Sequence, residues 1–195
     1  MIGPLSIIVF LSIYLFLQRH TIPNRIRDLR DGAIGVIYTP LVFLAIAISG
    51  VGAVILSQHI PILQWGWLGH NALHAPVTTG TGGIATGTDG VSWASTLQYT
   101  LATLLWILVI LLLIFAFILF NYDEENLFRG SWSLVGFWAI YHLIMGIPLF
   151  SVIPIFAAGI VFKIIHDRKG LEVAYVTHVA TNTTGLIFLV TINTV

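Results

Sequence analysis

Residues 104–120 of the chain read LLWILVILLLIFAFILF, and residues 122–130, which follow almost at once, read YDEENLFRG. The first stretch carries no charge and suits a helix that crosses a membrane. The second brings Asp123, Glu124, Glu125 and Arg129 to the end of that helix. Ionisable side chains in or beside a membrane span are costly unless they are paired or hydrated. We therefore expect this acidic stretch to belong to a functional site.

The composition of the whole chain is that of an integral membrane protein. Of its 195 residues, 57% are hydrophobic and 8% are charged, whereas about a quarter of the residues in soluble domains are charged. Eight basic and eight acidic residues balance, which leaves no basic surface for nucleic acid. Cysteine is absent, and this excludes disulfides, thiolate metal sites and a cysteine nucleophile. We expect the lipid bilayer as a partner and no nucleic acid.

Apolar runs bounded by polar residues predict the architecture. We expect an all-α, polytopic membrane protein in which residues 1–195 form a single transmembrane domain. The N-terminal run lacks a basic segment and a small-residue cleavage site, so we interpret it as a retained span. Pro148 and Pro154 favour a turn between the fourth and fifth spans. Six spans are predicted, at residues 2–18, 33–57, 100–121, 132–149, 151–166 and 173–193.

Residues 57–96 form the long loop of this prediction, and their sole charge is Asp89. Residues 60–75 carry tryptophans and histidines and suit a short interfacial helix. His70 and His74 have helical spacing, but no acidic or thiolate ligand lies near them in the sequence, so the interfacial helix explains them better than a metal. The remainder of the loop is a Gly/Thr-rich connector.

Basic residues predict the orientation, because short loops rich in Lys and Arg stay in the cytoplasm. With six spans, all eight basic residues fall on one side of the membrane. The acidic stretch then lies on the cytoplasmic side, and the long loop and both termini lie outside. The eight are Arg19, Arg25, Arg27, Arg30, Arg129, Lys163, Arg168 and Lys169.

Helical spacing predicts different roles for the two glutamates of the acidic stretch. Glu125 and Arg129 are four residues apart, so a carboxylate and a guanidinium can pair on one helix face. Glu124 points about 100° away. Two adjacent carboxylates in a low-dielectric pocket resist ionising together. We therefore expect Glu125 to be the structural acid and Glu124 to be the free one.

Two later motifs offer partners for Glu124. His178 and Asn182 are four residues apart and project to the same side of the last predicted span, and His142 lies within the fourth. Facing a carboxylate, these groups are able to activate a water and stabilise the oxyanion of amide hydrolysis. Hydrogen bonding between helices in lipid is the alternative explanation for His178 and Asn182.

The order Glu-Glu-x-x-x-Arg, aromatic-x-x-x-His and His-x-x-x-Asn within residues 122–182 resembles the CAAX protease and bacteriocin-processing (CPBP, or Abi) family of intramembrane endopeptidases. The resemblance implies hydrolysis of a peptide or protein substrate in a cavity that opens to the cytoplasm and the membrane, in a prokaryotic cell membrane. Its implied site consists of Glu124 as general base on water, His142 as its assistant, His178 and Asn182 as oxyanion hole, and Glu125 and Arg129 as support.

Two details of the chain modify this resemblance. Trp138 stands where the family usually has phenylalanine. Glu124 and His142 are only 18 residues apart, and a straight helix rises about 1.5 Å per residue. Bringing the two side chains to one site therefore requires a break in the helix near Gly130.

We expect no cofactor. Glu124, His142 and His178 together are a conceivable zinc set, but the sequence lacks the closely spaced H-E-x-x-H pattern of zinc proteases, so water activated by glutamate is the favoured mechanism. Two other functions stay open. One is a non-catalytic membrane subunit or scaffold that uses its polar cluster to bind a partner. The other is a small transporter or proton relay, although no inverted repeat favours it.

Overall fold

The computed structural model describes residues 4–65, 93–145 and 147–192. The chain divides into two compact units, one of residues 1–22 and 76–119 and the other of residues 23–75 and 120–195. The motif residues from Glu124 to Asn182 all belong to the second unit. The site can therefore be described within one unit.

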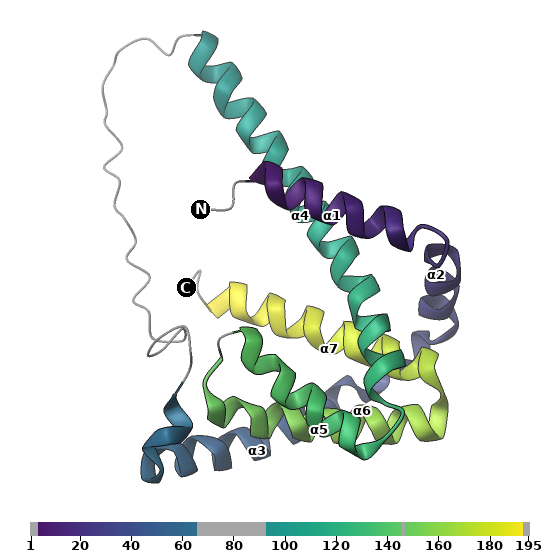
Figure 1. Ribbon diagram of the computed structural model, residues 1–195, viewed down its shortest axis with the longest axis vertical. Coiled ribbons are helices and arrows are strands. Elements are labelled where there is room, and N and C mark those ends of the chain that lie inside the picture. The colour runs from purple at the N-terminus through teal and green to yellow at the C-terminus, as the bar shows by residue number, and fades with distance from the viewer. Residues whose placement is uncertain (1–3, 66–92, 146, 193–195) are drawn as a thin grey trace. The chain divides into compact units, whose positions relative to one another are not determined.

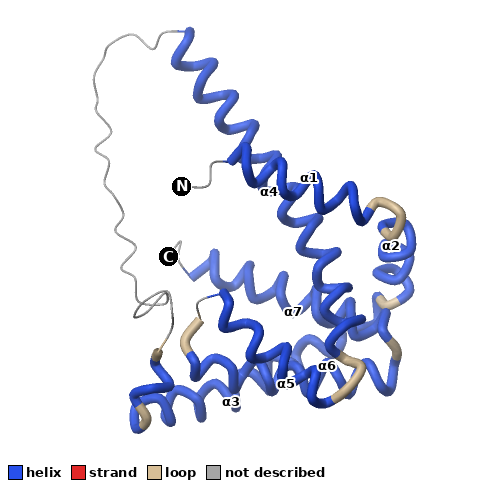
Figure 2. Tube along the Cα trace, viewed as in Figure 1, coloured by secondary structure: helices blue, strands red, loops and turns tan. Residues whose placement is uncertain are grey.

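Helices and the turns between them make up the whole described part of the chain, as Figures 1 and 2 show. The predicted all-α fold is confirmed for these residues. The α-helices are α1 (Pro4–Gln18), α2 (Ile22–Asp31), α3 (Thr39–His59), α4 (Trp93–Phe128), α5 (Trp132–Tyr141), α6 (Val152–Lys169) and α7 (Leu171–Ile192). Short 3-10 segments are η1 (Ala33–Tyr38), η2 (Pro61–Gln64), η3 (His142–Met145) and η4 (Leu149–Ser151).

Among the described residues, three helical segments are long and apolar enough to cross a membrane, namely Ala33–His59, Thr103–Phe128 and Leu149–Lys169. They correspond to the second, third and fifth predicted spans. The first and fourth predicted spans correspond to shorter apolar helices, Ile8–Gln18 and Trp132–Ile144. The sixth corresponds to α7, whose middle carries threonines, a histidine and an asparagine.

The long helix α4 ends later than predicted. The third span was expected to end at residue 121, but α4 continues to Phe128. The acidic residues therefore lie on the last turns of the helix itself. After Arg129 and Gly130 the chain turns, and Ser131 caps α5 with its Oγ, which accepts a hydrogen bond from the Leu134 N–H at 3.3 Å. The break that the 18-residue spacing requires is thus present near Gly130.

The predicted fourth span, residues 132–149, is not one helix. α5 ends at Tyr141, and a 3-10 turn continues to Met145. The His142 imidazole takes the Trp138 carbonyl that a further α-helical turn would use, while the His142 backbone N–H bonds to the Ile140 carbonyl. Pro148 then has the extended conformation, with φ −62° and ψ 149°. A side chain of the site therefore takes part in the contacts at the end of the helix that precedes it.

The predicted loop at residues 57–96 is described only at its start. α3 runs to His59, and η2 follows at Pro61–Gln64. The rest of the expected interfacial helix, with His70 and His74, and the Gly/Thr-rich connector with Asp89 lie outside the described residues.

Helix α6 lies at the centre of the second unit, where α3, α5 and α7 all pack against it. Its Gly159 permits the close approach of α5, because a Cβ atom there would lie 2.8 Å from Val135 Cγ1 and 3.1 Å from Trp138 Cε3. Gly170, with φ +96°, ends α6 and allows the chain to turn into α7. One apolar core cluster of the unit consists of Val42, Phe128, Trp138, Ala139, Ala158 and Phe162.

Close backbone contact also fixes the start of α7. A Cβ atom on Gly35 of η1 would collide with the Val173 carbonyl oxygen. Thr177 Oγ is 2.9 Å from the Gly35 carbonyl oxygen and 2.7 Å from that of Val173. The hydroxyl therefore ties η1 to α7 one residue before His178. This contact sets the position from which His178 extends.

Candidate functional site

The innermost contact of the site is a fully buried ion pair between Glu125 and Arg129. Arg129 Nε donates to Glu125 Oε2 at 3.2 Å, and Nη2 lies 2.9 Å from Oε1 as an ion-pair contact. Both side chains have an exposed fraction of 0%. The guanidinium carbon lies 4.1 Å from the centroid of the Trp138 ring, in cation–π geometry. The pairing predicted from the four-residue spacing is confirmed.

His178 joins this ion pair to Glu124. Its Nδ1 lies 2.8 Å from Glu125 Oε1, and its Nε2 lies 3.7 Å from Glu124 Oε2. The Glu125 carboxylate, paired with arginine, can only accept a hydrogen bond, so Nδ1 carries a proton and donates it. Nε2 is left to face Glu124. The Phe162 ring stacks on the imidazole with the centroids 4.5 Å apart, which fixes the orientation of the ring.

Charge balance links the protonation of Glu124 to that of His178. Arg129 and Glu125 cancel, so the four groups are neutral overall when Glu124 and His178 hold one proton between Oε2 and Nε2. Glu124 is 5% exposed and His178 is 2% exposed, and net charge is expensive at such burial. At 3.7 Å the two atoms are in electrostatic contact, beyond ordinary hydrogen-bond length.

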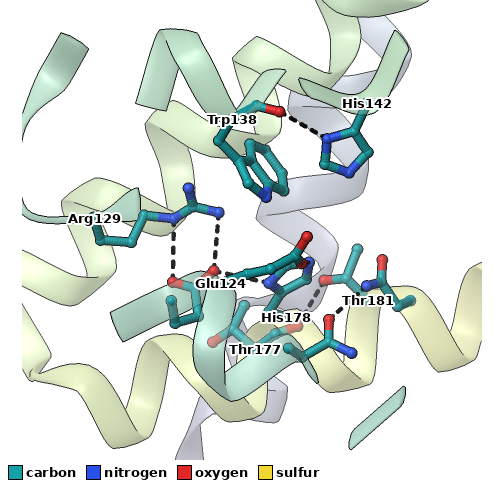
Figure 3. Close-up of polar contacts among 10 residues, drawn as sticks. Glu124, Arg129, Trp138, His142, Thr177, His178 and Thr181 are labelled. Atoms are coloured by element: carbon teal, nitrogen blue, oxygen red, sulfur yellow. Dashed lines mark hydrogen bonds and ion pairs between the residues drawn. The ribbon is translucent and has the colours of Figure 1, made fainter. Parts of the chain in front are cut away.

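His142 has a single defined tautomer when neutral. Its Nδ1 lies 2.8 Å from the Trp138 carbonyl oxygen, and a carbonyl only accepts, so Nδ1 carries the proton and Nε2 keeps its lone pair. The imidazole packs against the Trp138 indole with the ring centroids 4.6 Å apart. Figure 3 shows the Glu124, His142 and His178 side chains directed toward the same space beside that indole. The three residues come from α4, η3 and α7.

Asn182 is engaged with a residue that the sequence analysis did not single out. Its Nδ2 donates to Asn121 Oδ1 at 2.7 Å. Asn121 is 1% exposed and precedes Glu124 by three residues on α4, so both face the same side of that helix. That spacing was the available signal. Asn182 lies near the predicted site, but part of its donor capacity holds α7 to α4.

A second ion pair on α4 was also missed. Arg25 Nη2 lies 2.6 Å from Asp123 Oδ1, and Nη1 donates to Oδ2 at 3.1 Å. The sequence analysis had assigned Arg25 only to membrane orientation. The guanidinium also lies over the Tyr122 ring, 4.9 Å from its centroid. Arg25 therefore anchors α2 to the end of α4 that carries the site.

The zinc alternative has no preformed ligand set in the described part of the chain. No group of three or more His, Cys, Asp or Glu side chains there is arranged to hold a metal ion. Glu124 and His178 are neighbours, but together with His142 they do not meet that arrangement. The contacts of the two histidines instead fix which ring nitrogen carries the proton, since Nδ1 of each faces an acceptor.

Comparison of the chain with protein-family models, with curated proteins and with solved structures gives no match. In the part of the chain that the structure describes, the fold and the site define an all-helical protein, with three helices suited to a membrane and a buried cluster of charged side chains. The resemblance to the CPBP family remains a prediction that rests on the motifs.

Proposed function

We propose that this chain is an intramembrane endopeptidase similar to the CPBP family, which hydrolyses a peptide bond with water activated by Glu124. The observation that carries the proposal is the continuous series of buried contacts from Arg129 through Glu125 and His178 to Glu124. Burying such a series is costly and does not by itself favour folding. We interpret this buried series as an arrangement that prepares Glu124 to exchange a proton.

The proposed reaction uses Glu124 as base and then as acid. Its carboxylate takes one proton from a water molecule while the water oxygen bonds to the peptide carbonyl carbon. The lone pair on His142 Nε2 accepts the other hydrogen of that water and orients it. Collapse of the tetrahedral intermediate breaks the C–N bond, and the proton on Glu124 passes to the leaving amine. The products are a carboxylic acid and an amine.

The burial pattern supports a direction of approach. Glu124 and His178 are buried, whereas His142 and Asn182 are half-buried. A substrate would therefore reach the reacting groups along the side formed by His142 and Asn182. We place this side toward the cytoplasmic face of a prokaryotic cell membrane, in a multi-pass protein in which α1, α5 and α7 also cross. The predicted grouping of all eight basic residues on one side supports that orientation.

Replacement of Glu124 by glutamine tests the proposal. Cells that express the wild type should accumulate new peptide termini in their membrane fraction, detectable by terminal labelling and mass spectrometry. Glu124→Gln should abolish them, because an amide cannot accept the proton. Glu172→Gln is the matched control, since it makes the same change at a half-buried glutamate near the start of α7. Termini that persist in Glu124→Gln would overturn the mechanism.

The buried Glu124 and His178 side chains, 3.7 Å apart, also favour a second candidate, a proton relay or small transporter. It predicts proton flux into liposomes that contain the purified protein, driven by a gradient and lost in Glu124→Gln, without any peptide product. A co-purifying protein that survives Glu124→Gln, with neither product nor flux, would favour a scaffold instead.

A further inference from the structure

The Trp138 indole carries a buried donor that has no acceptor among the described residues. The side chain is 2% exposed, and Nε1 has no hydrogen-bond partner there. Leaving a buried N–H unpaired is unfavourable, and buried indoles usually have a partner. Nε1 is therefore a position where an acceptor from outside the chain would be stabilised.

The packing of the indole determines where this donor points. Its Cε3 and Cζ3 atoms face α6, where a Cβ on Gly159 would lie 3.1 Å from both. Nε1 is on the opposite edge of the ring system, so it points away from Gly159. Figure 3 shows that edge directed toward Glu124 and His178, and the His178 ring meets the indole edge-on with the centroids 5.7 Å apart.

The donors of His142, His178 and Asn182 are committed in whole or in part to other acceptors. The Nδ1–H groups of His142 and His178 are bound to the Trp138 carbonyl and the Glu125 carboxylate. His142, when neutral, presents a lone pair on Nε2, and a proton on His178 Nε2 faces Glu124. Asn182 Nδ2 donates to Asn121. Stabilising an oxyanion requires N–H groups that are aimed at the developing charge before the reaction, and Trp138 Nε1 meets this requirement.

We infer that Trp138 Nε1–H donates a hydrogen bond to the carbonyl oxygen of the peptide bond that is cleaved, and strengthens that bond as the oxygen becomes negative. This inference rests on the proposed function. When water adds to the carbonyl carbon, the π electron pair moves to the oxygen, which accepts the indole proton as a hydrogen bond without taking it. Phenylalanine, usual at this position in the resembling family, has no such donor. The donor is therefore a property of this chain's own sequence.

Trp138→Phe tests the inference, because it removes the N–H and keeps most of the aromatic packing. The substrate is a synthetic peptide spanning a bond whose cleavage depends on Glu124 in the terminal-labelling experiment. Loss of one such donor should lower kcat about 100-fold and leave KM within about twofold, because the bond strengthens chiefly in the transition state. Trp132→Phe is the control, since Trp132 is 55% exposed at the start of the same helix, and it should change neither constant.

A binding measurement separates a donor from a merely structural tryptophan and does not require Trp138→Phe to fold. In the Glu124→Gln variant labelled with 15N at tryptophan, adding the same peptide should move the indole N–H resonance of Trp138 downfield and leave that of Trp132 in place. Cleavage that depends on Glu124, with an unmoved Trp138 resonance or an unchanged kcat in Trp138→Phe, would overturn the role of Trp138 alone. Absence of any cleavage that depends on Glu124 would overturn the proposed function as well.

Discussion

Two ion pairs near the end of α4 use the same chemistry in different surroundings. Arg129 and Glu125 are four residues apart, and both side chains are 0% exposed. Arg25 and Asp123 are 98 residues apart and bond through two oxygens, and the Asp123 side chain is 36% exposed. Water can replace a lost partner only in the second pair. Burial therefore decides how much stability is lost when one partner is removed. Removing one member of a buried pair leaves an uncompensated charge, whereas an exposed pair is screened.

Breaking the buried pair should have the largest effect. Arg129→Leu leaves the Glu125 carboxylate buried without its guanidinium and removes the cation that lies over Trp138. We expect the free energy of unfolding in detergent to fall by about 3–5 kcal/mol, measured by denaturant titration followed by circular dichroism. Cleavage should be lost as well, because His178 would no longer be held by a fixed carboxylate.

The double variant Glu125→Leu/Arg129→Leu is the matched control for that loss. It removes both charges together, so it should recover much of the stability that Arg129→Leu loses, because apolar residues often replace a buried pair at little cost. Activity should not return. An Arg129→Leu protein within about 1 kcal/mol of the wild type would mean that this pair is worth no more than an exposed one.

The packing around the buried pair leaves no room for a larger side chain at Gly159. In Gly159→Ala the new methyl group meets Val135 Cγ1 at 2.8 Å and the Trp138 ring at 3.1 Å, so the indole beneath Arg129 has to move. Overpacking of this kind costs about 1–3 kcal/mol, which thermal unfolding in detergent would detect. The matched change Gly52→Ala, inside helix α3, meets nothing within 4 Å, so it gains helix propensity without overpacking and should not lower the unfolding temperature.

The two ion pairs also show which contacts can be predicted from the sequence and which cannot. The Glu125–Arg129 pair and the break near Gly130 are local, so helical spacing was sufficient to predict both. The apolar runs predicted where helices lie because burial and lipid both select for such runs. Arg25–Asp123 and Asn121–Asn182 join distant segments, and no spacing rule connects residues that only folding brings together.

Local side-chain chemistry set the remaining limit on prediction. Hydropathy extended the fourth span to residue 149, but α5 ends at Tyr141, where the His142 imidazole bonds to the Trp138 carbonyl. Hydropathy assigns each residue a value and does not register such a bond. His142, which the sequence analysis assigned to the site, therefore also lies at the helix boundary that hydropathy did not predict.

Breaking the half-exposed pair should have the smallest effect. Asp123→Asn keeps the shape of the side chain and removes its charge, so we expect a loss of about 0.5–1 kcal/mol, the upper part of the range for exposed pairs. The Arg25 guanidinium is itself buried, which holds the loss near that upper part. Asp31→Asn is the control, because the Arg30–Asp31 pair is exposed on both sides, and it should change stability less. Raising the salt concentration should shrink the Asp123→Asn loss through screening and leave the Arg129→Leu loss nearly unchanged. Equal salt dependence for the two losses would contradict the view that burial distinguishes the pairs.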